Sequence, residues 1–476
     1  TKGLVLVAIA LIALVTAFTG TLSGPMREWG VTDIVTETFG LRLVPAEREG
    51  RIILLYHAIA VAVVAIETYL ITDAVPMQPH EQAQINATIT CGYLSTLVCG
   101  LWFGYFGHEF VFHGLYLFGL SLTFFAGLLL AAALWPWRKA FRNEDPGRAH
   151  WGHVDLERVA FFVMAVATLG SALLGAVTGS YWGNGHETFL AEDILREPEK
   201  TSLQLAIIGH LHIMLTLIAV ALALLVGRWL DFRGALHKIA MPLFVVGTVV
   251  ITLGVWAVVP FEPIAHTIIY VGSTIVLLGA LLLVIYGFGK LVRDRLAAQA
   301  IATPTFGQRV AALLHDPLKF GALWQMVFMN FVVSFPGIFM AVKLDEIFRV
   351  WPLREERVIL TGHWHVLSGI VATIILLYYA DLAGLKGRVR KLFGWTVILA
   401  SDLAFGAALI YMLKRLFVPP SGESILVNVT TLLMDAGLGL VLAALAALMG
   451  WRLVDLFKPR GRWRVELDEA ETEVSA

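Results

Sequence analysis

Gly209-His210-Leu211-His212 stands near the start of one long apolar run, and Gly362-His363-Trp364-His365 stands near the start of another, 153 residues further along the chain. Counting back 153 residues from His210 reaches His57, which also lies near the start of an apolar run. Further matches at this offset are Gly234 with Gly387, Lys238 with Lys391, and Glu109 and His113 with Glu262 and His266. Agreement of several residue types at one offset indicates an internal repeat. The sequence therefore predicts three units, approximately 1–136, 157–288 and 320–450, within a single domain that covers 1–476.

The composition is that of a membrane protein. The chain has 476 residues, of which 58% are hydrophobic and 15% charged, and its mean hydropathy is +0.77. Soluble domains are about 45–50% apolar and about 25% charged, so this chain has too little polar surface to cover a water-soluble particle of its size. The net charge is −1 and basic residues gather only in short loops, which argues against nucleic acid as a partner.

Apolar runs recur from end to end, and each is long enough to cross a hydrocarbon core about 30 Å thick. They lie near 3–19, 52–72, 87–107, 110–136, 157–180, 203–227, 236–260, 264–288, 320–344, 357–380, 391–413 and 425–450. Lipid cannot satisfy backbone groups and the runs lack the alternation of barrel strands, so all should be helices. No small-residue cleavage site follows the first run, so we count it as a span. The predicted fold is an all-α integral membrane protein with twelve transmembrane helices in three pseudo-symmetric four-helix arcs.

The distribution of basic residues predicts the orientation of the chain. Most of the 35 Lys and Arg residues lie on the face that holds both termini and the loops after the even-numbered spans. The positive-inside rule therefore places both termini, and a tail over 451–476, in the cytoplasm. We expect the protein in a bacterial or archaeal cytoplasmic (inner) membrane.

Histidines near the starts of the even-numbered spans are the candidate ligands of a metal. They are His57, His113, His210, His212, His266, His363 and His365. One such histidine could form a helix-to-helix hydrogen bond, but seven at a similar depth need a shared reason. The two side chains of a His-x-His pair point about 200° apart on a helix, so one helix can serve two sites. This favours haem, whose iron accepts an imidazole on each face, over a tetrahedral zinc site.

The twelve spans, the lone His57 in the second span and Gly362-His363-Trp364-His365-Val366-Leu367-Ser368 in the tenth resemble the core subunit of haem-copper oxidases and nitric oxide reductases. The resemblance implies that His57 and His365 hold a low-spin haem b. It also implies that His363 faces a second haem.

The sequence departs from that family where the catalytic metal would bind. The segment from Ile239 to Pro260 contains no histidine, whereas the family has two adjacent histidines in this span. We therefore expect no copper and doubt oxygen or nitric oxide reduction. Rotating the His57 and His365 pair by one repeat predicts a second haem b between His212 and His363. His266 borders the same pore and could replace His212.

A third haem is possible because His210 is then left without its equivalent partner. His113 borders that pore and could fill the vacancy. Cys91 and Cys99 lie inside one apolar stretch and fit neither a disulfide framework nor covalent attachment of haem c.

Other polar residues give weaker signals. Arg48, Arg51, Arg354 and Arg357 lie just before the haem-facing segments, where they could pair with haem propionates or simply be solvated. Glu67, Asp402 and Asp435 lie within spans and could form a proton path or be satisfied buried acids.

These observations predict a multi-haem b-type cytochrome that passes electrons between a quinone pool and a redox partner in a respiratory or photosynthetic complex. Its partners would be other subunits of that complex, quinone or quinol, and a periplasmic c-type cytochrome or iron–sulfur subunit. No residue is assigned a catalytic role. The alternative is a terminal oxygen or nitric oxide reductase whose second metal is bound by His210, His212 and His266. A transporter is a third class, disfavoured because a carrier does not need paired histidines at one depth.

Overall fold

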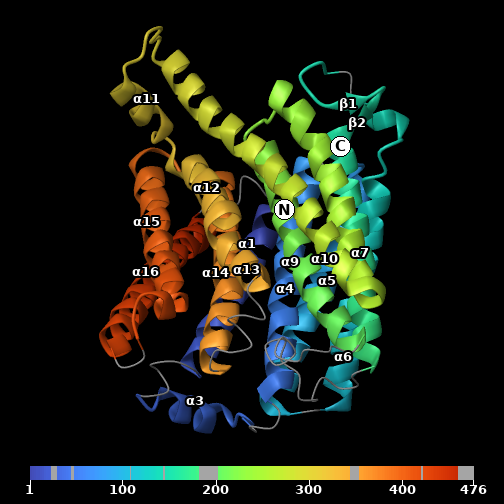
Figure 1. Cartoon of the computed structure of the whole chain (residues 1–476), viewed down its shortest axis with the longest axis vertical. Coiled ribbons are helices and arrows are strands. Elements are labelled where there is room, and N and C mark those ends of the chain that lie inside the picture. The colour runs from blue at the N-terminus through green and yellow to red at the C-terminus, as the bar shows by residue number, and fades with distance from the viewer. Residues whose placement is uncertain are drawn as a thin grey trace.

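The chain is an all-α, multi-pass membrane protein (Figure 1). The computed structural model describes residues 1–22, 29–43, 48–107, 109–142, 145–181, 202–342, 353–419 and 422–458. Within these ranges, 11 helices are long and apolar enough to cross a membrane. This confirms the predicted fold class and membrane location at that level.

The long helices follow the predicted spans closely. They are α1 (Lys2–Thr21), α4 (Arg48–Ala74), α5 (Pro79–Phe106), α6 (Phe110–Ala133), α7 (Leu156–Tyr181), α9 (Ser202–Trp229), α10 (Ala235–Ala298), α12 (Pro317–Val327) continuing through a π-helical segment into α13 (Ser334–Val342), α14 (Leu353–Leu382), α15 (Gly387–Met412) and α16 (Glu423–Phe457). The short elements are α3 (Val31–Phe39), α11 (Phe306–Leu313), η2 (Lys139–Phe141), η5 (Lys414–Leu416), β1 (His150–Trp151) and β2 (Val154–Asp155). We use the name histidine end for the end of the molecule at which α4, α9 and α14 begin, at the bottom of Figure 1. We use the name terminal end for the opposite end, at the top of Figure 1, which carries the β1–β2 hairpin.

Helix α10 is a hairpin of two apolar segments. Its 64 residues run without a loop, but Phe261 has non-helical angles (φ −146°, ψ 56°). Pro260 and Pro263 flank this residue, and proline removes the N–H group that the helical ladder needs. Beyond the kink the chain folds back on itself, so that a Cβ added to Gly272 would lie 2.5 Å from the backbone nitrogen of Ile251. The predicted spans 236–260 and 264–288 are therefore the two halves of α10.

The predicted span 320–344 contains an irregularity that hydropathy does not reveal. Residues Phe328–Val333 form a π-helical segment between α12 and α13. A π turn adds one residue to the helix and changes the register of everything beyond it. It therefore resets which residues of α13 face α14.

The helix contacts follow a closed order. Helix α5 packs between α4 and α6, and α15 packs between α14 and α16. Helix α9 packs against both α7 and α10. Contacts between α6 and α7, α10 and α12, and α16 and α1 close a ring. Helix α9 also contacts α4 and α14, so these three lie toward the inside. His57, His210 and His363 lie on these three helices at the offset of the sequence repeat.

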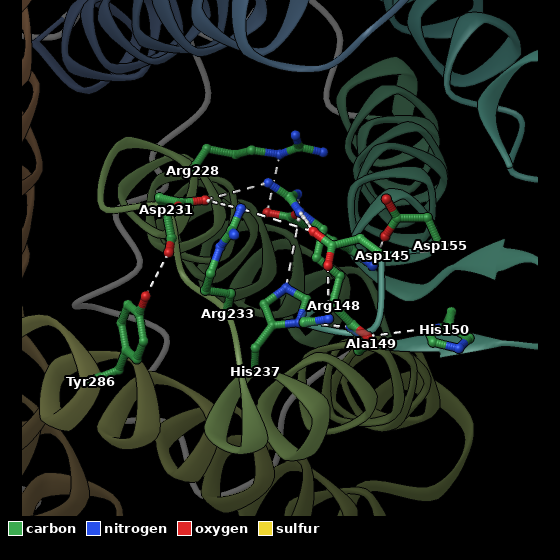
Figure 2. A network of polar contacts seen from close by, with 12 residues as sticks. Asp145, Arg148, Ala149, His150, Asp155, Arg228, Asp231, Arg233, His237 and Tyr286 are labelled. Atoms are coloured by element: carbon green, nitrogen blue, oxygen red, sulfur yellow. Dashed lines mark hydrogen bonds and ion pairs between the residues drawn. The ribbon is translucent and has the colours of Figure 1, made fainter. Parts of the chain in front are cut away.

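A charged network ties α7, α9 and α10 together at the terminal end (Figure 2). The Glu157 carboxylate lies 2.7 Å from Arg148 and 3.1 Å from Arg228. The fully buried His237 places its Nε2 4.0 Å from Glu157 and accepts a hydrogen bond from Ala149 N at its Nδ1 (2.9 Å). The network thus anchors the loop before α7 to two helix ends.

A second charged network occupies the corresponding helix ends one repeat later. Arg390 binds both carboxylate oxygens of Asp316 (2.7 and 2.8 Å) and also binds Asp381. Asp381 and Arg390 lie 153 residues after Arg228 and His237. The repeat therefore retains a clamp at these helix ends while exchanging which positions carry the acid and the base.

Candidate functional site

The candidate site lies among the histidines near the histidine end. His57, His113, His210, His212, His363 and His365 lie in the first half of α4, α6, α9 or α14, and His266 follows the kink of α10. Glu109 caps α6, and Glu262 directly follows Phe261. The two Glu-x-x-x-His segments that the repeat paired therefore lie at corresponding helix starts.

The ring of His210 is held against α7. Its Nδ1 lies 2.9 Å from the carbonyl oxygen of Ser171. A Cβ added to Gly175, one turn further along α7, would lie 2.3 Å from Cε1 of His210. Glycine at this position therefore makes the room that the imidazole occupies.

His363 lies against α13 in a similar way. A Cβ added to Gly337 would lie 2.8 Å from its Nε2, and its buried Nδ1 has no hydrogen-bond partner among the described residues. Gly337 lies 162 residues after its counterpart on α7, Gly175. His363 itself lies 153 residues after His210. The spacing of 162 residues between α7 and α13 is longer, and one of the extra residues is the one that the π turn adds.

The helix α4 brings neighbouring residues to two different histidines. The rings of His57 and His210 lie nearly parallel, with centroids 6.2 Å apart and an interplanar angle of 18°. The ring of Tyr56 lies 6.3 Å from that of His365 at 64°. His365, the predicted partner of His57, is therefore next to the residue that precedes His57.

His212 lies where the second predicted pair should meet. Its imidazole lies within electrostatic range of those of His363 and His266. Its side chain is exposed within the described part of the chain. The predicted pair and the alternative ligand therefore lie in one region of the structure.

The hydrogen bonds of His210 and His212 leave one ring nitrogen of each free to bind a metal. Nδ1 of His212 lies 2.9 Å from the carbonyl oxygen of Ile208, and Nδ1 of His210 has its own carbonyl partner. An Nδ1–H donated to a carbonyl leaves the lone pair on Nε2, the arrangement common in metal-binding histidines. Either side chain could therefore supply an axial ligand to a haem iron.

His113 lies apart from these groups in the described contacts. Its ring stacks on Phe103 of α5, with centroids 5.3 Å apart and an interplanar angle of 7°. Glu109 accepts a hydrogen bond from Phe112 N (3.2 Å) and so fixes the start of the same helix. The structure assigns His113 an aromatic neighbour, and its proposed role toward His210 stays a prediction.

Of the four arginines proposed to pair with propionates, Arg51 has a described side chain. Its Cγ lies 3.8 Å from the position that a Cβ of Gly104 would take, on α5. Arg48, Arg354 and Arg357 lie in the first turns of α4 and α14, and their side chains lie outside the described residues.

An ion-pair cluster at the start of α14 escaped the sequence analysis. Arg415 lies 2.5 Å from Glu355 and 2.9 Å from Glu423, and the fully buried Lys414 lies 3.7 and 3.5 Å from the same carboxylates. Two cations and two anions balance each other here. The charges come from three separate elements, so no local motif announces the cluster.

The described residues contain no group of three or more His, Cys, Asp or Glu side chains arranged to hold a metal ion. The His57 ring lies 6.2 Å from that of His210, and His212 lies within electrostatic range of His363 and of His266. A bis-histidine haem takes two imidazoles as its protein ligands, and these helices supply donors of that chemistry.

Comparison with known proteins leaves the function to be argued from the chain itself. No family model, no curated protein and no solved structure matches it.

Proposed function

We propose that the protein is a membrane-embedded multi-haem b-type cytochrome that transfers electrons within a respiratory or photosynthetic complex. The observation that carries the proposal is the gathering of histidines from the inner helices α4, α9 and α14. The His57 ring lies 6.2 Å from that of His210, and His212 lies within electrostatic range of His363. His212 and His363 each belong to a His-x-His pair whose other member projects to a different side of its helix. Histidines in a membrane interior are costly unless they bind or relay something.

The proposed architecture is twelve transmembrane helices in three pseudo-symmetric arcs, counting the halves of α10 separately. The closed order of helix contacts and the equally spaced His57, His210 and His363 on α4, α9 and α14 support it. Gly234 and Gly387 give further support. Gly234 directly precedes α10, and Gly387 is the first residue of α15. The two glycines lie 153 residues apart, and both have positive φ (86° and 59°). This resembles the haem-copper oxidase core to which the sequence pattern points.

Within this architecture, His57 and His365 would hold one low-spin haem b, and His212 and His363 a second. Bound haem supplies reversible one-electron chemistry at its iron. The protein's part is to fix the imidazoles, which it does for His212 through the carbonyl partner at its Nδ1. With two histidines on each iron, no open position would remain for a substrate, which favours electron transfer over catalysis. Neither copper nor covalent haem c belongs to the proposal.

The proposed partners are quinone or quinol, a periplasmic c-type cytochrome or iron–sulfur subunit, and other subunits of the complex. The basic residues at the terminal end support a cytoplasmic location for that end in a bacterial or archaeal membrane. The histidine end would then face the periplasmic partner. The exposed Asp435 in the middle of α16 supports a neighbouring subunit, because a carboxyl group facing lipid is costly.

A second candidate is an oxygen or nitric oxide reductase with a second metal at His210, His212 and His266. The proximity of His266 to His212 is the observation that favours it.

The optical spectrum of the purified, dithionite-reduced protein separates these candidates. The proposal predicts low-spin b-type bands that carbon monoxide does not change. A carbon monoxide-sensitive band would favour the reductase, and a spectrum without haem bands would contradict both.

A further inference from the structure

Three acidic residues lie inside the apolar spans, and the structure gives each a different environment. Asp402 accepts hydrogen bonds from Trp324 Nε1 and Gln325 Nε2, both at 2.8 Å. Asp435 is exposed on α16. Glu67 is 5% exposed, and within the described part of the chain its Oε1 is fully buried without a hydrogen-bond partner. Glu67 is thus the acid whose burial needs an explanation.

Glu67 points toward the inside of the helix ring. Tyr69, two residues on, bonds to Thr90 of α5 (2.5 Å), so that face of α4 packs outward against α5. A step of two residues rotates the side chain by about 200°, which turns Glu67 away from α5. Tyr56, eleven residues earlier, lies within about 20° of Glu67 on the helical wheel. Tyr56 contacts His365, so Glu67 shares the face of α4 that meets α14.

The repeat shows that helix packing does not require an acid here. Counting 153 and 306 residues on from Glu67 gives Val220 and Thr373. These residues follow His212 and His365 by eight positions on their helices. Eight residues are about 12 Å of helix, so Glu67 lies two turns toward the terminal end from the level of these histidines.

Glu67 lies nearer the terminal end than the histidine end. It is seven residues before Ala74, where α4 ends, which corresponds to about 10 Å of helix. Titratable residues on α4 or neighbouring helices toward this end include Lys2, Tyr69, Asp73, His80, Glu81, Cys91, Tyr93, Arg228, Tyr378, Tyr379 and Asp381. No hydrogen bond or ion pair joins Glu67 to these residues in the described structure. The exposed Asp73 lies between Glu67 and the end of the helix.

We propose that Glu67 is a proton-binding site that takes up a proton from water at the terminal end when the haem held by His57 and His365 is reduced. The electron comes from a quinol through the electron-transfer chain, and the carboxylate gains one proton to become a carboxylic acid. Reoxidation removes the electron and returns the proton. The charge on Glu67 and the electron on the haem would be about two helical turns apart in a medium of low dielectric constant, where charges interact more strongly than in water. This interaction couples reduction of the haem to protonation of Glu67. The redox step rests on the proposed function, whereas proton binding by Glu67 does not.

The first test is the dependence of the haem midpoint potentials on pH in the purified protein. Proton uptake on reduction makes the potential of the coupled haem fall as pH rises. We expect this fall in the native protein, in D402N and in D435N, and a potential that no longer changes with pH in E67Q. Glu67→Asp keeps a carboxyl group and should keep part of the dependence. Equal slopes in E67Q and the native protein would overturn the proposal.

The second test is infrared spectroscopy of the same proteins, and it does not depend on haem. A proton-binding Glu67 gives a carboxylic acid C=O band that shifts in D2O and is missing in E67Q. The melting temperature of E67Q checks that the variant is folded. A preparation that lacks haem would contradict the proposed function, while the C=O band would still decide whether Glu67 binds a proton. Absence of a band assignable to Glu67 at any pH would overturn the inference.

Discussion

His210 and His363, 153 residues apart in the chain, each lie over a glycine of the preceding helix. A Cβ added to Gly175 would lie 2.3 Å from the His210 ring, and one added to Gly337 would lie 2.8 Å from the His363 ring. Such a match in side-chain packing is stronger evidence of a repeat than the spacing of histidines alone. It also identifies residues that hold the histidines without binding a metal themselves.

The glycines beneath these histidines should be intolerant of a methyl group. Gly175→Ala and Gly337→Ala place a Cβ 2.3 and 2.8 Å from the imidazoles, so the ring must shift or the helices must separate. We expect a loss of about 1–3 kcal/mol of stability. Thermal unfolding measured by circular dichroism is the readout. Gly179→Ala on α7 is the matched control, since nothing lies within 4 Å of its added Cβ. Equal melting temperatures for all three variants would contradict the described packing.

Replacing His212 and His266 separately identifies the second ligand of the haem on His363. His212→Ala should convert one low-spin haem into a carbon monoxide-binding form, because it removes an axial ligand. His266→Ala should leave both haems low-spin. His150→Ala, in the β1–β2 hairpin, controls for nonspecific effects. The opposite outcome, with carbon monoxide binding in the His266 variant alone, would mean that the repeat selected the wrong histidine.

The clamp around Arg390 should contribute strongly to stability. Arg390→Met leaves Asp316 and Asp381 without their shared cation at the ends of α12 and α14. These side chains are partly buried, and losing a charge-assisted hydrogen bond of this kind costs about 1.5–3 kcal/mol. Arg388→Met, at an exposed position on the same helix, should have little effect. Chemical unfolding of both variants in the same detergent gives the comparison, and equal midpoints would show that the clamp is dispensable.

The orientation can be tested with single cysteines at two highly exposed positions. Cys91 and Cys99 are first replaced by alanine. Trp151→Cys lies in the hairpin at the terminal end (native side chain 83% exposed) and Phe110→Cys at the histidine end (85%). A membrane-impermeant maleimide added to whole cells should label the Phe110 variant only. Labelling of the Trp151 variant instead would reverse the proposed orientation.

The sequence predicted the long elements because hydropathy alone determines where a chain can cross a lipid bilayer. The kink at Phe261 was less visible, since both halves of α10 are apolar and only Pro260 and Pro263 mark the break. The π-helical segment Phe328–Val333 could not be predicted, because one extra residue does not alter the hydropathy of the run.

The site was predicted in part. The repeat pairs His212 with His363, and the two lie within electrostatic range of each other. It did not anticipate that His57 would lie beside His210, because an offset in sequence does not say which way neighbouring residues on α4 turn. The terminal clamps were missed for a related reason. Arg228 and Asp381 are equivalent in position but carry opposite charges, and a search for identical residues passes over such an exchange.

Electron paramagnetic resonance of the oxidised protein, combined with haem quantification, tests the central claim most directly. Two bis-histidine haems predict two haem b equivalents per chain, both giving low-spin ferric signals, with no high-spin signal. A preparation with one low-spin and one high-spin haem, or one without haem, would contradict the account.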